Sequence, residues 1–161
     1  MTMTAMVFSG LGMSETMRCR VCSPKQHVGG TPTLQGLLVV NTRVVVVDDV
    51  ADIRWLLRAA LNADGRFEVV GEAGDGREGV EVVTLTHPHV AVIDLRMPRM
   101  DGLEAAAEIA QVSPETRVVI FSAVGEAAVA AAAQAAGVVG FVKKGSPPRA
   151  IVDAVALAAA S

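Results

Sequence analysis

Tyrosine is missing from this 161-residue chain, aromatic residues make up only 3% of it, and cysteine occurs twice. Three further absences limit the kinds of protein that the chain can be. No apolar run reaches the roughly 18 residues that a membrane-spanning helix needs, and the N-terminal stretch lacks the early positive charge and long apolar core of a secretory signal. With a net charge of −3, the chain also lacks the basic excess that favours nucleic-acid binding. We therefore expect a cytoplasmic protein that neither enters a membrane nor binds nucleic acid directly.

The two cysteines, Cys19 and Cys22, form a lone CxxC motif in a stretch without helical or strand periodicity. A structural zinc site needs four ligands, and only His27 lies nearby as a third. A redox pair would be expected beside a strand–helix–strand unit rather than in a lead-in rich in Gly, Pro and Thr. We interpret the two thiols as incidental, with the zinc and redox roles as alternatives.

The chain divides near residue 42. Residues 1–42 mix Met, Thr, Gly, Ser and Pro without a period, carry a charge of +2, and are predicted to be a flexible N-terminal tail or the product of a start site placed too early. Residues 43–161 carry −5 and change abruptly to Val-rich runs that alternate with Ala-rich segments. We expect these residues to form one domain of common size.

Five short apolar runs in residues 43–161 are each followed by a segment with helical spacing of apolar residues. The predicted strands are 44–47, 67–71, 90–94, 118–122 and 138–142. The predicted helices are 53–61, 77–85, 103–111, 126–136 and 147–160. Five such rounds in about 120 residues predict an α/β fold, a doubly wound five-stranded parallel sheet with helices on both faces.

Chemically active side chains follow four of the five predicted strands, and parallel strands present their carboxyl ends at one edge of a sheet, where ligands of such folds bind. Carboxylates crowded at that edge repel one another unless a cation or a shared proton relieves them, and Mg²⁺ prefers such oxygen ligands. A lysine and a hydroxyl opposite would stabilise a phosphoryl group on a carboxylate. The residues at this edge are Asp48, Asp49, Asp94, Ser122, Lys143 and Lys144.

Four motifs stand in order along the chain: VVVVDD, VIDLRMPRMDG, VVIFSA and GFVKK. Together they resemble the response-regulator receiver domain, the CheY-like phosphoacceptor module of two-component signalling, over residues 43–160. The resemblance implies a flavodoxin-like (βα)5 fold with strand order 2-1-3-4-5, an order for which CheY is a standard example. The stretch EAGDGREG, and the Lys144-Gly145 pair with Pro147 shortly after it, are most similar to receivers of LuxR-type regulators.

The resemblance implies that Asp94 accepts a phosphoryl group in a reaction that depends on Mg²⁺. Asp49 would ligate the metal directly, Asp48 mainly through water, and Arg96 through its backbone carbonyl. Without the resemblance, Asp48 and Asp49 could simply cap the following helix, because Asp is a favourable N-cap residue.

Three further residues take roles from the resemblance. Ser122 would hydrogen-bond a phosphoryl oxygen and move inward on phosphorylation, and Lys144 would pair with the phosphoryl group. Phe141 matches the family's switch aromatic, although it lacks the hydroxyl that Tyr would offer. The alternative for the Lys143–Lys144 pair is a solvated surface.

The implied partners are a sensor histidine kinase or a phosphotransfer protein, and a second copy of the chain through the fourth helix, fifth strand and fifth helix. The chain would be a phosphoacceptor, with autophosphatase activity at most, rather than an enzyme. One alternative is a receiver-like interaction module that works without phosphorylation. Another is a nucleotide-binding enzyme, because Gly74, Gly76 and Gly79 match the G-x-G-x-x-G pattern of dinucleotide-binding turns.

Overall fold

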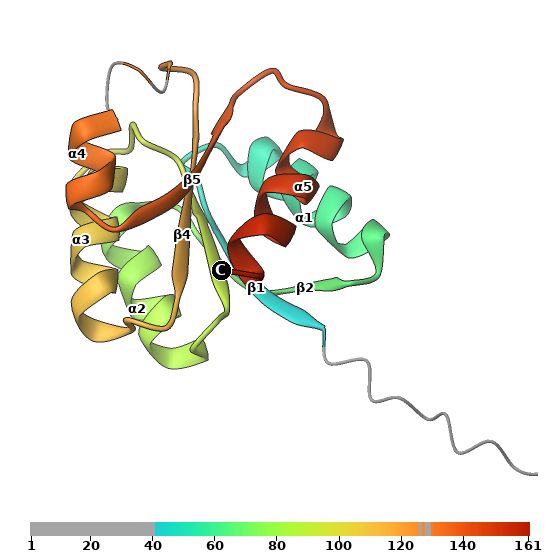
Figure 1. The fold of residues 1–161 in the computed structure, drawn as a ribbon, viewed down its shortest axis with the longest axis horizontal. Helices are drawn as coiled ribbons and strands as arrows, with labels where there is room; N and C mark the ends of the chain where they lie inside the picture. The colour runs from blue at the N-terminus through green and yellow to red at the C-terminus, as the bar shows by residue number, and fades with distance from the viewer. Residues whose placement is uncertain (1–40, 126, 128–129) are drawn as a thin grey trace, which may run out of the picture. The chain divides into compact units, whose positions relative to one another are not determined.

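The computed structural model describes residues 41–161 except 126, 128 and 129, and five strands alternate with five helices along them (Figure 1). The predicted tail, with Cys19 and Cys22, lies outside the described residues up to residue 40. The strands are β1 (Thr42–Val47), β2 (Phe67–Ala73), β3 (Val90–Ile93), β4 (Arg117–Ser122) and β5 (Val138–Lys143). The helices are α1 (Ala51–Asp64), α2 (Gly76–Thr86), α3 (Gly102–Val112), α4 (Ala130–Ala135) and α5 (Pro148–Ala159).

All five strands are parallel and form one sheet in the order β2-β1-β3-β4-β5, which confirms the predicted fold class. Every residue is apolar where β1 and β3 pair with each other, and Val44 to Val47 are at most 1% exposed. Such runs suit a strand that is covered on both faces. The order places the ends of β1 and β3 side by side, and therefore brings Asp48 close to Asp94.

Helices cover both faces of the sheet. α1 and α5 lie against one face, where Leu57, Leu61 and Val155 pack against alternate valines of β1 and β3 (Figure 1). α2, α3 and α4 lie against the other face, where Val83 and Ile109 enter the core. Among the described helices, none is both long and apolar enough to span a lipid bilayer.

Several predicted boundaries were too short. β2 continues through Gly71 to Ala73 because its backbone pairs with β1 as far as Val47, and main-chain hydrogen bonding does not depend on the missing side chain. β1 begins at Thr42, and α1 extends to Asp64, where Gly65 adopts φ 77° and ends the helix. The predicted fourth helix corresponds to α4, and part of its predicted first turn lies outside the described residues.

Candidate functional site

Three carboxylates meet at the carboxyl ends of β1 and β3. The Asp48 N–H donates to the Ala73 carbonyl at 3.1 Å, and the Asp94 N–H donates to the Val47 carbonyl at 2.8 Å, so the ladder itself holds both backbones. One carboxylate oxygen from each of Asp48, Asp49 and Asp94 lies within 4.8 Å of the others. Asp48 and Asp94 are buried, whereas Asp49 is exposed. The predicted acidic cluster is therefore present, with one of its carboxylates open to solvent.

The ammonium group of Lys144 bridges two of these acids. Its Nζ lies 2.7 Å from Oδ2 of Asp48 and 2.9 Å from Oδ2 of Asp94. The same ammonium lies 5.7 Å from the centre of the Phe121 ring, a contact that stabilises a cation through the face of the ring. Lys143 is exposed and makes no ion pair among the described residues. The two lysines therefore differ in their contacts: of the pair, Lys144 reaches the acids and Lys143 does not.

The pKa values of Asp48 and Lys144 are both raised. Burial raises the pKa of Asp48, and the hydrogen bonds from Lys144 and from the Val50 N–H offset only part of that effect. Burial also opposes the charge on Lys144, but the Asp48 and Asp94 carboxylates outweigh it, so the pKa of Lys144 is raised. A buried carboxylate is thus held close to an ammonium that stays charged at neutral pH.

We expect Lys144→Met to lower the free energy of unfolding by about 2 kcal/mol in Mg²⁺-free buffer. Removing one partner from a fully buried ion pair costs roughly 3–5 kcal/mol, and the Lys144 side chain is 20% exposed, so the cost is smaller here. Because pairing raises the pKa of Lys144, its contribution is complete at neutral pH and is lost as the pH rises through that raised pKa. Chemical denaturation at several pH values measures both effects.

Lys143→Met is the matched control, because it removes an equal charge from an exposed neighbouring side chain, and should change stability by less than about 0.5 kcal/mol. Added Mg²⁺ should raise the unfolding temperature of Lys144→Met more than that of the wild type, since the cation replaces the missing positive charge. Equal destabilisation by both substitutions would contradict this account.

The donor set suits a divalent cation. Among the described residues, the fully buried Oδ2 of Asp48 has no hydrogen bond besides its ion pair with Lys144, so a second lone pair could accept a hydrogen bond from a metal-bound water. Carboxylate oxygens are hard ligands, and the exposed Asp49 leaves room for the waters that Mg²⁺ retains. Arg96 lies two residues after Asp94 in the loop between β3 and α3 and is exposed. Asp48, Asp49 and Asp94 are therefore the candidate ligands, and the Arg96 carbonyl remains a candidate from the resemblance alone.

The predicted hydroxyl and aromatic residues lie on β4 and β5. Ser122 ends β4 and is 1% exposed, and its Oγ accepts a hydrogen bond from the Val124 N–H at 3.1 Å, which leaves its own hydrogen available for donation. Phe141 is half-buried on β5 and lines a shallow pocket with Ala133 and Val139. Ser122 therefore lies at the same edge as the acids, whereas Phe141 lies three residues upstream of Lys144.

The glycines of the G-x-G-x-x-G pattern have other uses in this structure. The Gly74 N–H donates to Oε2 of Glu78 at 2.7 Å, so that backbone donor is already paired. A Cβ at Gly76 would lie 2.7 Å from Met100, and a Cβ at Gly79 would lie 2.9 Å from the Val47 side chain. Close packing and a local hydrogen bond explain the three glycines without a nucleotide.

Sequence reasoning missed several contacts that support the site. Arg54 donates from Nη1 to the Asp48 carbonyl at 2.6 Å, and its Nε lies 3.7 Å from Glu72. Arg99 pairs with the buried Asp75, 24 residues away along the chain. The Arg54–Asp48 contact spans only six residues, whereas the Arg54–Glu72 and Arg99–Asp75 pairs join segments that meet only in the folded chain.

Comparison with known proteins agrees with this geometry. A family model described as the response regulator receiver domain matches residues 44–156. The chemotaxis protein CheY of Thermotoga maritima is 36% identical over 116 residues, which cover 72% of this chain and 96% of that protein. The transcriptional regulators among the relatives are longer, and the chain spans 53–61% of the length of three of them.

Solved structures show the same similarity. The signal receiver domain of NarL from Mycobacterium tuberculosis superposes with a TM-score of 0.72 at 40% identity, covering 75% of this chain and 98% of that one. A LuxR-family two-component response regulator from an Aurantimonas species gives a TM-score of 0.71 at 32% identity, covering 74% and 86%. The similarity includes a LuxR-family protein, as the EAGDGREG stretch predicts.

Proposed function

The chain belongs to the response regulator receiver domain family of two-component systems, and from this premise we propose that Asp94 is its phosphoacceptor. The observation that carries the proposal is the convergence of three carboxylates and one ammonium at a single edge of the sheet. Asp48 and Asp94 both lie in the acidic cluster and both pair with Lys144. We assign the acceptor to Asp94 because the VIDLRMPRMDG motif that contains it resembles the phosphoacceptor segment of the family. The proposed role is that of a phosphoacceptor, with autophosphatase activity at most.

The proposed reaction transfers a phosphoryl group from a phosphohistidine to Asp94. A carboxylate oxygen of Asp94 forms a bond to phosphorus while the phosphorus–nitrogen bond breaks, and the imidazole leaves with the bonding electron pair. Lys144 already lies 2.9 Å from Asp94 and would pair with the transferred group. Ser122 would donate its hydroxyl hydrogen to a phosphoryl oxygen. Both residues then stabilise charge that arrives with the phosphoryl group.

We further propose that the metal is Mg²⁺, held by Asp49, Asp94 and the Arg96 carbonyl, with Asp48 acting mainly through water. When bound, Mg²⁺ supplies positive charge to the incoming phosphoryl oxygens. The chain's own residues orient the reacting carboxylate, because Asp94 is fixed by the sheet at its backbone and by Lys144 at its side chain.

Incubation with acetyl phosphate and Mg²⁺ tests the proposal directly. We expect intact-mass spectrometry to show a gain of one phosphoryl group in the presence of Mg²⁺ and none in excess EDTA. Without the cation, the repulsion between the acidic cluster and the dianionic donor is not relieved. A chain that gains no mass with Mg²⁺ would instead support the receiver-like interaction module that works without phosphorylation. An equal gain in EDTA would contradict the metal requirement.

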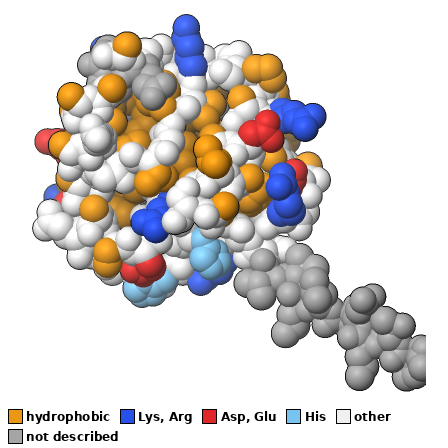
Figure 2. Space-filling view, viewed as in Figure 1, with side chains coloured by type: hydrophobic (Ala, Val, Ile, Leu, Met, Phe, Trp, Pro, Cys, Tyr) orange, Lys and Arg blue, Asp and Glu red, His pale blue; other side chains and the backbone are white. Residues whose placement is uncertain are grey.

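The proposed partners are a sensor histidine kinase or a phosphotransfer protein, in the cytoplasm, and a second copy of this chain. The face viewed in Figure 2 carries β5 between α4 and α5, and apolar side chains are visible among scattered Lys and Arg. Val139 on β5 is 44% exposed and Leu157 on α5 is 71% exposed. Reversing a 1:99 ratio of active to inactive forms needs about 5.5 kcal/mol, more than one lysine–phosphoryl contact is expected to supply. Partner binding at the α4–β5–α5 face would supply the remainder.

A further inference from the structure

We propose that Asp75 and Arg99 are positioning residues for the metal site. Their ion pair fastens the loop between β3 and α3, residues 95–101, to the start of α2, and thereby holds the Arg96 carbonyl where the cation binds. The inference rests on the proposed function, because that function assigns the carbonyl to the metal. The Asp75–Arg99 contact itself is a feature of the structure and does not depend on that assignment.

Asp75 joins two parts of the molecule through one carboxylate. Its Oδ1 accepts a hydrogen bond from the Glu78 N–H at 2.9 Å and so caps the first turn of α2. Its Oδ2 pairs with the guanidinium of Arg99. The Asp75 side chain is only 4% exposed, whereas that of Arg99 is 74% exposed, so the carboxylate is shielded from solvent and the guanidinium is not. A carboxylate that only capped the helix would not need the second partner.

Arg99 adopts a backbone conformation that arginine does not favour. Its φ is 70°, and among the described residues only one other non-glycine residue, His87, has a positive φ. The left-handed conformation costs free energy in any residue with a Cβ, and glycine would avoid that cost. Arginine in this position aims its side chain at Asp75, which indicates that the ion pair compensates for the strain.

Residues 95–101 are also held by contacts at Leu95 and Met100. A displacement of Arg99 should therefore change the conformation of the whole loop rather than of one residue. The Gly102 N–H donates to the Leu95 carbonyl at 2.9 Å and closes the loop on itself. Met100 fills the space beside Gly76, where a Cβ would lie 2.7 Å from its side chain and from its carbonyl oxygen. Arg96 lies between these fixed points, so the conformation of the whole loop sets the position of its carbonyl.

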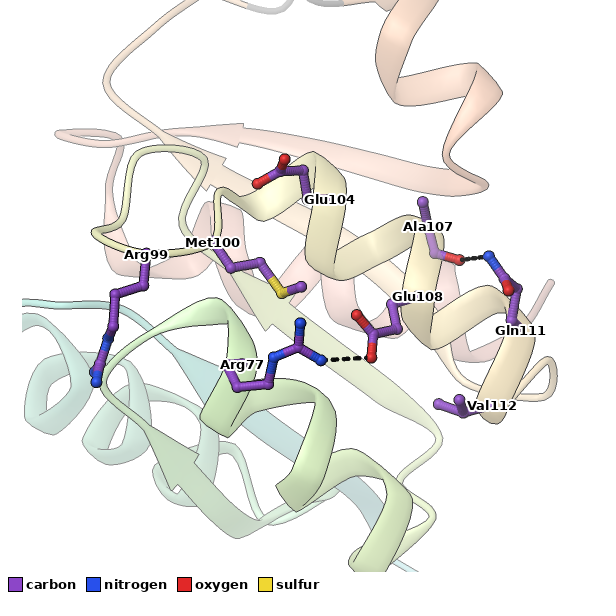
Figure 3. Close-up of a pocket in the computed structure, with 8 residues that line it drawn as sticks. All are labelled: Arg77, Arg99, Met100, Glu104, Ala107, Glu108, Gln111 and Val112. Carbon is purple, nitrogen blue, oxygen red and sulfur yellow. Dashed lines mark hydrogen bonds and ion pairs between the residues drawn. The ribbon is translucent and has the colours of Figure 1, made fainter.

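A second arginine in the same region offers a matched control. Figure 3 shows Arg99 extending from the loop toward the start of α2, whereas Arg77 reaches from α2 to Glu108 on α3. The Arg77–Glu108 pair measures 2.9 Å, and both side chains are substantially exposed. Arg77 therefore carries the same charge as Arg99 and lines the same pocket, but its ion pair within the described residues is with Glu108 and not with residues 95–101.

The test is a calorimetric titration of the full chain with MgCl₂, together with its unfolding temperature. Arg99→Gly should weaken Mg²⁺ binding about tenfold, the lower end of what the loss of an outer-shell partner costs a metal site. Its unfolding temperature should change little, since glycine adopts the positive φ without strain and this gain offsets the loss of the ion pair. Asp75→Asn keeps the cap on α2 and should weaken binding similarly, whereas Arg99→Lys should retain binding to within about threefold.

The sign of the Arg99→Gly effect separates positioning from simple electrostatics. Removing a positive charge near three carboxylates should tighten Mg²⁺ binding if only the overall charge matters. Arg77→Gln provides that comparison and should bind Mg²⁺ as the wild type does, or slightly more tightly. Unchanged or tighter binding by Arg99→Gly would overturn the inference and leave the proposed function standing. A wild-type chain that binds no Mg²⁺ would overturn both.

Discussion

Asp94→Asn is expected to abolish phosphoryl uptake from acetyl phosphate completely while leaving the fold intact. The amide has nearly the same shape as the carboxylate, so packing at this buried position is kept, but its oxygen is a far weaker nucleophile and a poorer metal ligand. Lys144 retains Asp48, 2.7 Å away, as a partner in the variant. Intact-mass spectrometry after incubation with Mg²⁺ measures the loss, and circular dichroism confirms the fold.

Asp153→Asn is the control for that experiment. Asp153 lies on α5, its side chain is 64% exposed, and its only ion pair among the described residues is with Arg149 on the same helix. The control should take up one phosphoryl group as the wild type does. If Asp94→Asn still gained one phosphoryl group, the acceptor would be another residue, and Asp48 and Asp49 would be the next candidates.

The second large effect is expected at Gly102, where alanine should lower the free energy of unfolding by about 3 kcal/mol. A Cβ on Gly102 would lie 2.2 Å from the Asp94 carbonyl oxygen and 2.9 Å from Cα of Leu95. Both atoms belong to the backbone and cannot move aside by a change of rotamer, so the cost reaches the upper part of the range for overpacking. Helix propensity alone predicts the opposite, a gain of about 1 kcal/mol, because Gly102 is the first residue of α3.

Denaturant titration measures this effect, and Gly125→Ala serves as its control. Among the described residues, a Cβ at Gly125 would meet nothing within 4 Å, so that substitution should change stability by less than about 0.5 kcal/mol. Gly102→Ala should also bind Mg²⁺ more weakly, because relief of the clash has to displace the chain beside Asp94. An increase in the stability of Gly102→Ala would mean that propensity dominates and that the close approach is easily relaxed.

The architecture could be predicted from the sequence because it follows from the burial of apolar runs. Val44 to Val47 form an unbroken apolar run that belongs in a strand covered on both faces, and the sheet buries these residues almost completely. The site could be predicted for a related reason, since parallel strands bring their carboxyl ends together. That rule places Asp94 beside Asp48, with Lys144 opposite, before any coordinate is known.

The remaining features depend on contacts that no local pattern encodes. The spacing of apolar residues does not distinguish Lys143 from Lys144 as partners of the acids, and only the family resemblance of the GFVKK motif selected Lys144. The backbone direction at the end of β5 decides it, and Lys144 is the residue that faces Asp48. The Asp75–Arg99 pair likewise joins two loops that meet only in the folded chain. The extension of β2 past Gly71 was missed because glycine has a low strand propensity, which predicts that the strand ends there. Its backbone nevertheless pairs with β1, and the pairing continues to Ala73.

The ends of β4 and β5 are linked in a way that bears on how a signal could leave this site. The Lys144 N–H donates to the Ser122 carbonyl at 2.8 Å, and Ser122 is also the register partner of Lys143. The hydroxyl and the ammonium proposed to contact the phosphoryl group are thus attached to one hydrogen-bonded pair of backbones. A displacement of either side chain moves the neighbouring strand as well. The contacts of Ser122 and Lys144 with the phosphoryl group should therefore form cooperatively. The resulting displacement of β5 would be transmitted through the turn at Gly145 to the start of α5.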